Sequence, residues 1–151
     1  MGDTRSVVMD DEQRAEFLQS GGTGVLSFGE DRDEAPYSLP VSYGYDSGSG
    51  HFFFRLLVGE EREKREQIED GRPVSFVTYA DTDDGWQSVV AAGSLERIDD
   101  ENVDPETLDE LRRVHIPIVD VYDRHPRELT FEFFRLDPEE IDGRTETVRE
   151  D

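Results

Sequence analysis

The segment PYSLPVSYGY, residues 36–45, restricts the possible folds of this chain more than any other stretch. Aromatic and aliphatic side chains occupy every second position, and Pro, Ser and Gly occupy the positions between them. This period of two belongs to an extended strand with two unlike faces. The two prolines favour a sheet edge or a bulge, because proline cannot donate a ladder hydrogen bond. Residues 36–45 are therefore predicted to be a strand with one apolar face and one face of small side chains.

A hairpin is predicted next, because the turn-forming DSGSG is followed by HFFFRLLV, residues 51–58. This second run is apolar on both faces except at Arg55, so most of its side chains are expected to be buried. Gly93 interrupts a later strand, and a bulge or a close backbone approach is expected there. The remaining strands are predicted over residues 23–28, 73–80, 86–98 and 128–136.

Short helices are predicted between some of the strands. Asp10 and Gln13 have the spacing of a capping box, which would begin a helix over residues 11–20. Gly21 and Gly22 would end it. The highly charged residues 60–71 are predicted to form a second helix, which Gly71 would end.

A third helix is predicted to begin at Asp104, an N-cap residue that Pro105 follows. Leu108 and Leu111 would form its apolar stripe. Strands that follow one another through tight turns, with only occasional helices, are typical of an antiparallel barrel or sandwich rather than a βαβ fold. The expected class is therefore mainly β, with six strands and peripheral helices.

The composition excludes several classes of partner. With 38 acidic and 16 basic residues, the chain has a formal charge of −22, which would repel nucleic acids and anionic lipids. Nine Phe and five Tyr residues are enough to build a core, so disorder is not expected. The acidity instead favours adaptation to molar salt, as in halophilic proteins, because concentrated salt screens charge repulsion at short range.

The length and the residue types also limit the architecture. At 151 residues, the chain is predicted to be one domain over residues 1–151, with residues 137–151 as a polar, acidic tail. The sequence has no cysteine, no apolar run long enough to span a bilayer and no signal-peptide core. A cytoplasmic protein without membrane or disulfide chemistry is therefore expected.

Three features could carry binding. The small-residue face of residues 36–45 would let a flat ligand lie against the backbone, although packing on another sheet or exposure to solvent explains the same pattern. Arg55 needs an anionic partner in its apolar strand, either a carboxylate of this chain or a ligand phosphate. Lys64 is the only lysine and lies near the start of the helix predicted over residues 60–71, where free N–H groups attract anions. Its alternative role is a surface ion pair with a neighbouring glutamate.

Catalysis by side chains alone is not indicated. No nucleotide-binding or hydrolase motif occurs, and Trp86 is expected in the core, whereas Gln87 and Ser88 could bind the edge of a ligand. Metal binding is not predicted, because three histidines lack the spacing of known ligand sets: His51, His115 and His125. If the chain is an enzyme, a bound cofactor has to supply the chemistry.

Several stretches, in order from about residue 9 to 144, resemble the pyridoxamine 5′-phosphate oxidase-like family of flavin-binding split barrels. They are GTGVLSF, APYSLPVSYGYD, GHFFFRL, PVSFVTY and WQSVVAAGSLERI. The most specific are PYSLPVSYGYD and the pattern W-x-S-V-x-x-x-G-x-x-E-R-I. The resemblance implies a six-stranded antiparallel split β-barrel. It also implies a homodimer with FMN in a cleft at the dimer interface.

The resemblance assigns site residues position by position. The isoalloxazine ring would be bordered by Pro40, Val41, Ser42 and Tyr43. The ribityl phosphate would run beside Phe54, Arg55 and Leu56, with Arg55 and Lys64 on the phosphate itself. Hydrogen bonds to the flavin or its phosphate would come from Gln87 and Ser88.

The leading hypothesis is an FMN-dependent oxidoreductase that works with a small-molecule electron donor and acceptor. The substrate-gripping residues of true pyridoxamine phosphate oxidases have no clear match in the C-terminal segment, so that vitamin substrate is not predicted. One alternative is a non-catalytic flavin or haem carrier, or a redox sensor, on the same barrel. Relatives of this kind also include users of a deazaflavin. A third possibility is a cofactor-free acidic interaction domain.

Overall fold

The computed structural model describes residues 3–29, 33–58, 71–98, 103–114, 116 and 130–149. The helix predicted over residues 60–71 lies outside these residues, and so does Lys64. The described elements are β1 (Asp3–Val8), α1 (Asp11–Leu18), β2 (Gly22–Phe28), β3 (Tyr37–Asp46), β4 (His51–Val58), β5 (Arg72–Thr82), β6 (Gly85–Ile98), α3 (Pro105–Arg113) and β7 (Thr130–Arg149).

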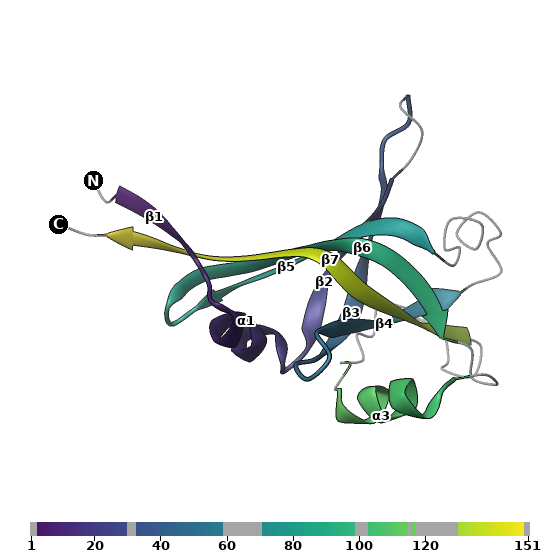
Figure 1. Ribbon diagram of the computed structural model, residues 1–151. Helices are drawn as coiled ribbons and strands as arrows, with labels where there is room; N and C mark the ends of the chain where they lie inside the picture. The colour runs from purple at the N-terminus through teal and green to yellow at the C-terminus, as the bar shows by residue number, and fades with distance from the viewer. Residues whose placement is uncertain are drawn as a thin grey trace.

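All seven strands belong to one antiparallel sheet (Figure 1). Their order is β1-β7-β4-β3-β2-β5-β6, and a further pairing between β7 and β6 closes the last six into a barrel. The predicted mainly β, six-stranded split barrel is therefore confirmed. The additional strand, β1, was not predicted, and it pairs with β7 outside the closed ring.

Strand β7 is 20 residues long and changes neighbours along its length. On one edge, residues 130–136 pair with β4 and residues 144–149 pair with β1. On the other edge, β6 follows it from Phe133 to Glu146. Residues 137–149, which were expected to form a polar tail, are therefore strand. Their backbone hydrogen bonds to β6 and β1 order them although their side chains are mostly polar.

Part of the sheet extends beyond the barrel as a ribbon, which we call the arm (residues 3–8, 78–89 and 143–149). Strand β5 pairs with β2 only from Val74 to Val77, so its later residues pair with β6 alone. The long β5–β6 hairpin continues outward with β1 and the end of β7 (Figure 1). The arm thus consists of the same strands as the barrel but is not closed into a ring.

The barrel core is aromatic. Phe52, Phe54 and Phe76 are completely buried, and the ring centroids of Phe54 and Phe76 lie 4.9 Å apart. Tyr43 packs edge-on against Phe76 at 5.1 Å. Phe53, on the opposite face of β4, is also fully buried, which confirms that both faces of this strand are covered. Rings at such distances add specific edge-to-face attraction to the burial of apolar surface.

Helix α1 begins and ends as predicted. The Gln13 N–H donates to the Asp10 carboxylate at 2.8 Å, and the Asp10 N–H donates to the Gln13 side chain at 3.0 Å. The helix ends before Gly21, which has a φ of 70° and whose N–H donates to the Leu18 carbonyl. Met9, just before the helix, donates its N–H to the Gly143 carbonyl and so ties α1 to the edge of β7.

Helix α3 also begins as predicted, but its buried face is different. The Asp104 carboxylate accepts a hydrogen bond from the Thr107 N–H at 2.7 Å, and this bond lowers the pKa of Asp104. Leu108, expected in the apolar stripe, is 36% exposed, whereas Thr107 and Glu110 are buried. The sheet beneath them presents polar partners. Arg135 donates to the Thr107 hydroxyl at 2.9 Å, and His51 Nδ1 lies 3.1 Å from the Glu110 carboxylate.

Gly93 marks a bulge, as predicted. The register between β6 and β7 shifts between Ala92 and Gly93. A Cβ atom at Gly93 would lie 2.7 Å from the Asp137 carbonyl oxygen, so the two backbones approach too closely for a side chain. The bulge lies where β7 passes from the barrel toward the arm.

Candidate functional site

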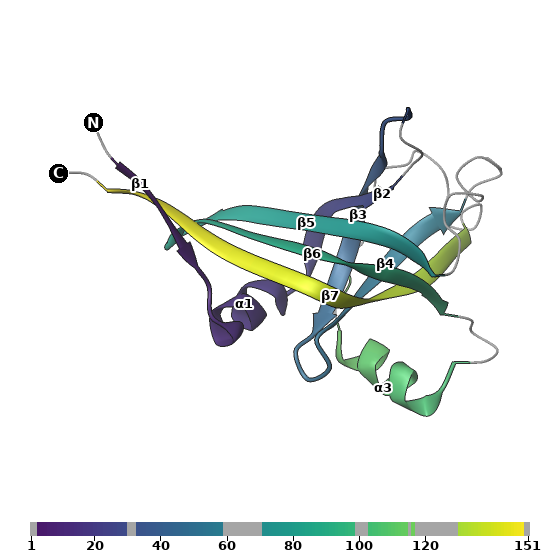
Figure 2. The same cartoon turned by 45° about the horizontal axis from the view of Figure 1, so that its top comes forward.

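Strands β3 and β4 separate part-way along their length. They pair only where Ser42–Asp46 face His51–Arg55. Beyond the Ser42–Arg55 pair, residues 37–41 pair with β2 alone, and residues 56–58 pair with β7 alone. Figure 2 shows β3 running with β2 while β4 turns away from it. We call this opening the fork (residues 37–42 and 55–58).

The fork explains the prolines of β3. Pro40 lies opposite Val25 of β2 and has no register partner on β4. The predicted edge position is therefore confirmed for residues 37–41, although residues 42–46 lie between two strands. Among the described residues, the backbone groups of residues 37–41 that point away from β2 have no strand partner, so they can bind a ligand.

The fork brings together half of the predicted flavin-binding positions, and Tyr43 and Phe54 form the next pair beside it. Pro40 is exposed, and Val41, Ser42 and Tyr43 are 6%, 8% and 2% exposed. The side chains of Val41 and Tyr43 belong to the core, so a ligand in the fork would meet their backbone. Only Pro40 and Ser42 direct small side chains to the opposite face of β3.

On the other limb of the fork, Arg55 lies directly opposite Ser42 and is partly buried. Its neighbours Phe54 and Leu56 are 0% and 1% exposed and lie in the core. Of these three predicted contacts, Arg55 alone can reach a ligand with its side chain, on the face it shares with Ser42. Lys64, the other predicted phosphate ligand, lies outside the described residues.

Gln87 and Ser88 lie on a different part of the molecule, in the arm. Ser88 pairs with Tyr79 and Arg144, and Gln87 pairs with Ala80 and Thr145. Trp86, beside them, is 52% exposed, so the expectation that it lies in the core was wrong. Among the described residues, no second layer covers the outer face of the arm, so the indole ring remains exposed there.

The outer face of the arm and the adjoining sheet carries several exposed apolar side chains among charged ones. Tyr79 is 64% exposed, and its ring centroid lies 5.9 Å from that of Trp86. Val25 and Val90 continue this face, because both are register partners of Val77. We call these exposed side chains the outer patch: Val8, Val25, Tyr79, Trp86 and Val90. Two large aromatic rings exposed side by side favour an interaction surface.

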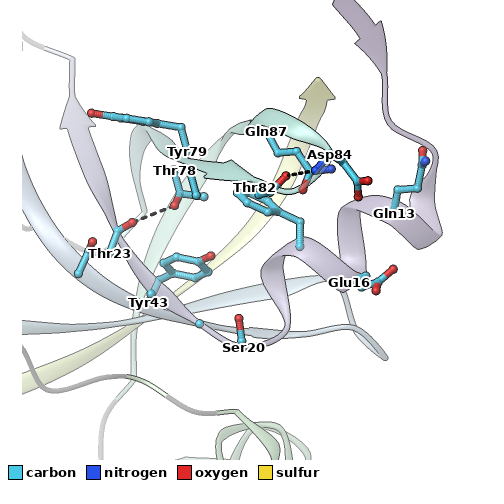
Figure 3. A pocket seen from close by; sticks show the side chains of 14 residues that line it. Gln13, Glu16, Ser20, Thr23, Tyr43, Thr78, Tyr79, Thr82, Asp84 and Gln87 are labelled. Carbon is cyan, nitrogen blue, oxygen red and sulfur yellow. Dashed lines mark hydrogen bonds between the residues drawn. The ribbon is translucent and has the colours of Figure 1, made fainter. Parts of the chain in front are cut away.

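A pocket of about 590 Å³ lies between α1 and the inner side of the arm (Figure 3). Its lining residues come from α1, the link to β2, and strands β2, β3, β5 and β6, with the turn between β5 and β6. Two of the predicted site residues, Tyr43 and Gln87, line it. Sequence patterns did not indicate this pocket, because each element contributes only a few residues. The only local signal is the glycine pair at 21–22.

A short hydrogen-bonded chain forms part of the pocket wall. The Thr78 hydroxyl donates to the Thr23 carbonyl at 2.8 Å (Figure 3), and Tyr43 hydrogen-bonds to Thr78. Burial raises the pKa of the Tyr43 phenol, and the hydrogen bond with Thr78 lowers it by less. Tyr43 is therefore a neutral phenol at ordinary pH.

The His, Asp and Glu side chains of the described residues nowhere form a group of three suited to a metal ion. Within the same part of the chain, neither helix has the length and apolarity needed to cross a bilayer.

Known proteins with this architecture bind flavins. An FAD-binding protein from Mesorhizobium loti aligns with a TM-score of 0.65 and 21% identity, covering 97% of this chain and 99% of its own. An FAD-binding protein from Mycobacterium smegmatis aligns with a TM-score of 0.66 and 15% identity, covering 93% of this chain and 99% of its own. An FAD- and haem-binding protein from Mycobacterium smegmatis aligns with a TM-score of 0.61 and 13% identity, covering 97% of this chain and 76% of its own.

At these identities the likeness shows the fold. No curated protein matches the chain. The family model for pyridoxamine 5′-phosphate oxidase, however, matches residues 10–145, which include every described element except β1 and the end of β7. The chain therefore belongs to the pyridoxamine 5′-phosphate oxidase family.

Proposed function

We propose that this chain binds FMN at the fork and is an FMN-dependent oxidoreductase. The observation that carries the proposal is the fork itself, in a member of this family. An unpaired backbone edge, small side chains and one cation meet where β3 and β4 separate. A flat heterocycle with hydrogen-bonding edges and a phosphate tail needs these three kinds of contact.

Each part of the fork would have its own role. The open backbone edge at Pro40 and Val41 would address the edge of the isoalloxazine ring, with Ser42 and Tyr43 bordering it. Ser42 would leave space for the ring and offer a hydroxyl, and Arg55 opposite it would neutralise the phosphate. Lys64 is proposed as the second phosphate ligand. When bound, the flavin supplies transfer of hydride or electrons, and the chain positions it and limits its contact with water.

The proposal includes a homodimer. Tyr79 and Trp86 are more than half exposed at 64% and 52%, on a face that nothing in the described chain covers. A second copy packed on the outer patch would bury both rings. Gln87 and Ser88 lie on the arm rather than at the fork of their own chain. In a dimer, Ser88, which shares the outer face with Tyr79, would contact the flavin held by the partner subunit, whereas Gln87 faces the inner side of the arm.

The second candidate is a flavin or haem carrier, or a redox sensor, without turnover. One of the similar solved structures binds both FAD and haem, which supports keeping this alternative. The similar structures named as flavin proteins bind FAD, so the identity of the bound nucleotide also has to be measured. Identification of the released cofactor would also reveal a bound deazaflavin.

The first test is the visible spectrum of protein purified in high salt, followed by identification of the released cofactor. A flavin spectrum and released FMN are expected. Colourless protein that FMN does not stabilise would overturn the proposal and leave a cofactor-free domain. Flavin reduction by nicotinamide without transfer to any acceptor would favour the carrier.

The second test compares FMN with riboflavin, which lacks the phosphate. Arg55→Met and Lys64→Met should each weaken FMN binding by about tenfold or more and change riboflavin binding little, since each removes a charged phosphate contact. Arg112→Met is the matched control, because Arg112 is 70% exposed on α3 and lies away from the fork. Equal losses for both ligands would show that the side chain does not bind phosphate.

A further inference from the structure

We propose that the pocket between α1 and the arm is a second small-molecule site, for an uncharged or cationic organic ligand rich in hydrogen-bond donors. The pocket measures about 590 Å³, which is in the range of ordinary ligand sites, about 300 to 1,000 Å³. It lies on the inner side of the arm, whereas the fork lies between β3 and β4. The inference does not depend on FMN binding.

The charges around the pocket argue against an anion. None of its lining residues is Lys, Arg or His, and two of them, Glu16 and Asp84, are exposed carboxylates (Figure 3). Phosphate groups need cations or convergent N–H donors. The flavin phosphate is therefore unsuited to this pocket, whereas an amidinium or amine would be attracted to it.

The buried polar groups of the pocket also favour a ligand that donates hydrogen bonds. A carbonyl can only accept, so the Thr78 hydrogen is directed to the Thr23 oxygen. The Thr78 oxygen therefore has only lone pairs left for another partner. A ligand that contacts Thr78 would have to supply the hydrogen-bond donor. Tyr43 is 2% exposed and Thr78 is 4% exposed, so this arrangement is shielded from bulk water.

Gln87 offers a second acceptor. Its side-chain nitrogen donates to the Thr145 hydroxyl at 3.4 Å, which leaves its Oε1 for a ligand N–H. Phe17 supplies aromatic surface to the same pocket, and ring faces attract organic cations. A Cβ atom at Gly22 would lie 3.5 Å from the Tyr43 ring, so a larger side chain there would cover the phenol.

The test uses three probes of one shape and different charge: benzamidine, benzamide and benzoate. Calorimetry in molar KCl suppresses general attraction of cations to the acidic surface. We expect benzamidine to bind at least about tenfold more tightly than benzoate, with benzamide between them. Benzoate binding as tightly as benzamidine, or no binding of benzamidine, would overturn the proposal.

Substitutions at lining residues test whether benzamidine binds in the pocket. Asp84→Asn and Glu16→Gln should each weaken benzamidine about threefold, the effect of one exposed ion pair. Their matched controls, Asp83→Asn and Glu12→Gln, remove the same charge beside the pocket at exposed positions that do not line it, and should have no effect. Equal effects of variants and controls would show unspecific attraction and contradict the site.

Two further measurements separate this site from the fork. Ala80→Phe, at an exposed lining position of β5, should block benzamidine while the protein keeps its circular dichroism spectrum. Saturating FMN should leave the benzamidine affinity unchanged. Displacement of benzamidine by FMN would mean that the pocket belongs to the flavin site, and the proposal of a second site would fail.

Discussion

The barrel and the arm are built from the same strands but treat their aromatic residues in opposite ways. In β5, Phe76 of the barrel is completely buried, whereas Tyr79, three positions later in the arm, is 64% exposed. In β6, Val89 on the inner face is fully buried and Trp86 on the outer face is 52% exposed. The difference arises because Phe76 and Tyr79 lie on opposite faces of β5. The barrel encloses the face of Phe76, whereas no described element covers the face of Tyr79.

This contrast indicates which region can be stable alone. The barrel contains its own core. Large aromatic side chains such as those of Tyr79 and Trp86 each bury about 150 to 250 Å² when they are covered. At about 25 cal/mol per Å², covering both would contribute on the order of several kcal/mol. The arm therefore gains from a partner surface, and the barrel does not need one.

Removal of salt is expected to have the largest effect, which is loss of the whole fold. With a charge of −22, dilution of molar KCl to low ionic strength restores self-repulsion, and the chain should unfold. Hydrogen exchange along a salt series should show the arm opening before the barrel, because the arm buries less apolar surface. A chain fully folded in dilute buffer would contradict salt adaptation.

Phe76→Ala is expected to have the next largest effect, about 3 to 5 kcal/mol of unfolding free energy. Phe76 is fully buried and contacts the rings of Tyr43, Phe52 and Phe54, so truncation leaves a cavity among three aromatic residues. Urea unfolding in molar KCl measures the loss, and Phe76→Leu should cost less. A loss below about 1 kcal/mol would show that the barrel core repacks.

Gly85→Ala should damage the arm and spare the barrel. Gly85 has a φ of 112°, and a Cβ atom there would lie 2.5 Å from the Glu146 carbonyl oxygen. The expected cost is about 1 to 3 kcal/mol, with faster hydrogen exchange confined to the arm. Gly48→Ala is the matched control, since its nearest contact would be an ordinary 3.7 Å from Asp46. Exchange that rises equally in the barrel would mean that both regions unfold together.

Trp86→Gln should change the stability of a single chain least, by about 0.5 kcal/mol or less, because the side chain is already exposed. The substitution should instead weaken self-association of the chain, which sedimentation in molar KCl measures. Leu108→Gln, at an exposed apolar position on α3 outside the outer patch, should leave association unchanged. Association unaffected by Trp86→Gln would remove the outer patch from the proposed dimer interface.

The barrel strands could be predicted from the sequence because their side chains alternate or form apolar runs between turn residues. The arm was harder to predict. Strand β1 and the second half of β7 have polar residues on both faces and are ordered by backbone pairing, which leaves no periodic signal. Helix α3 was assigned the wrong buried face, because the polar partners His51 and Arg135 are distant in sequence.

The candidate site could be predicted only in part. The resemblance placed Pro40 to Tyr43 and Arg55 together. The strand register brings Pro40, Val41, Ser42 and Arg55 to one fork, with Tyr43 directly beside it. Sequence reasoning could not tell that Phe54 and Leu56 lie in the core, because an apolar strand covered on both faces has no alternation to separate its sides. The pocket depends on the tertiary placement of α1 against the arm and leaves little trace in the sequence.

Strand β7 has a consequence for how the molecule is made. Residues 130–149 supply partners to β1, β4 and β6, so the ring cannot close during synthesis until this strand has emerged from the ribosome. Until then, Phe52 and Phe54 lack their neighbours Leu136 and Phe134. Folding that waits for such distant pairings is slow and leaves apolar strands exposed to neighbouring nascent chains. The strong negative charge of the chain would keep these unfinished copies apart during that interval.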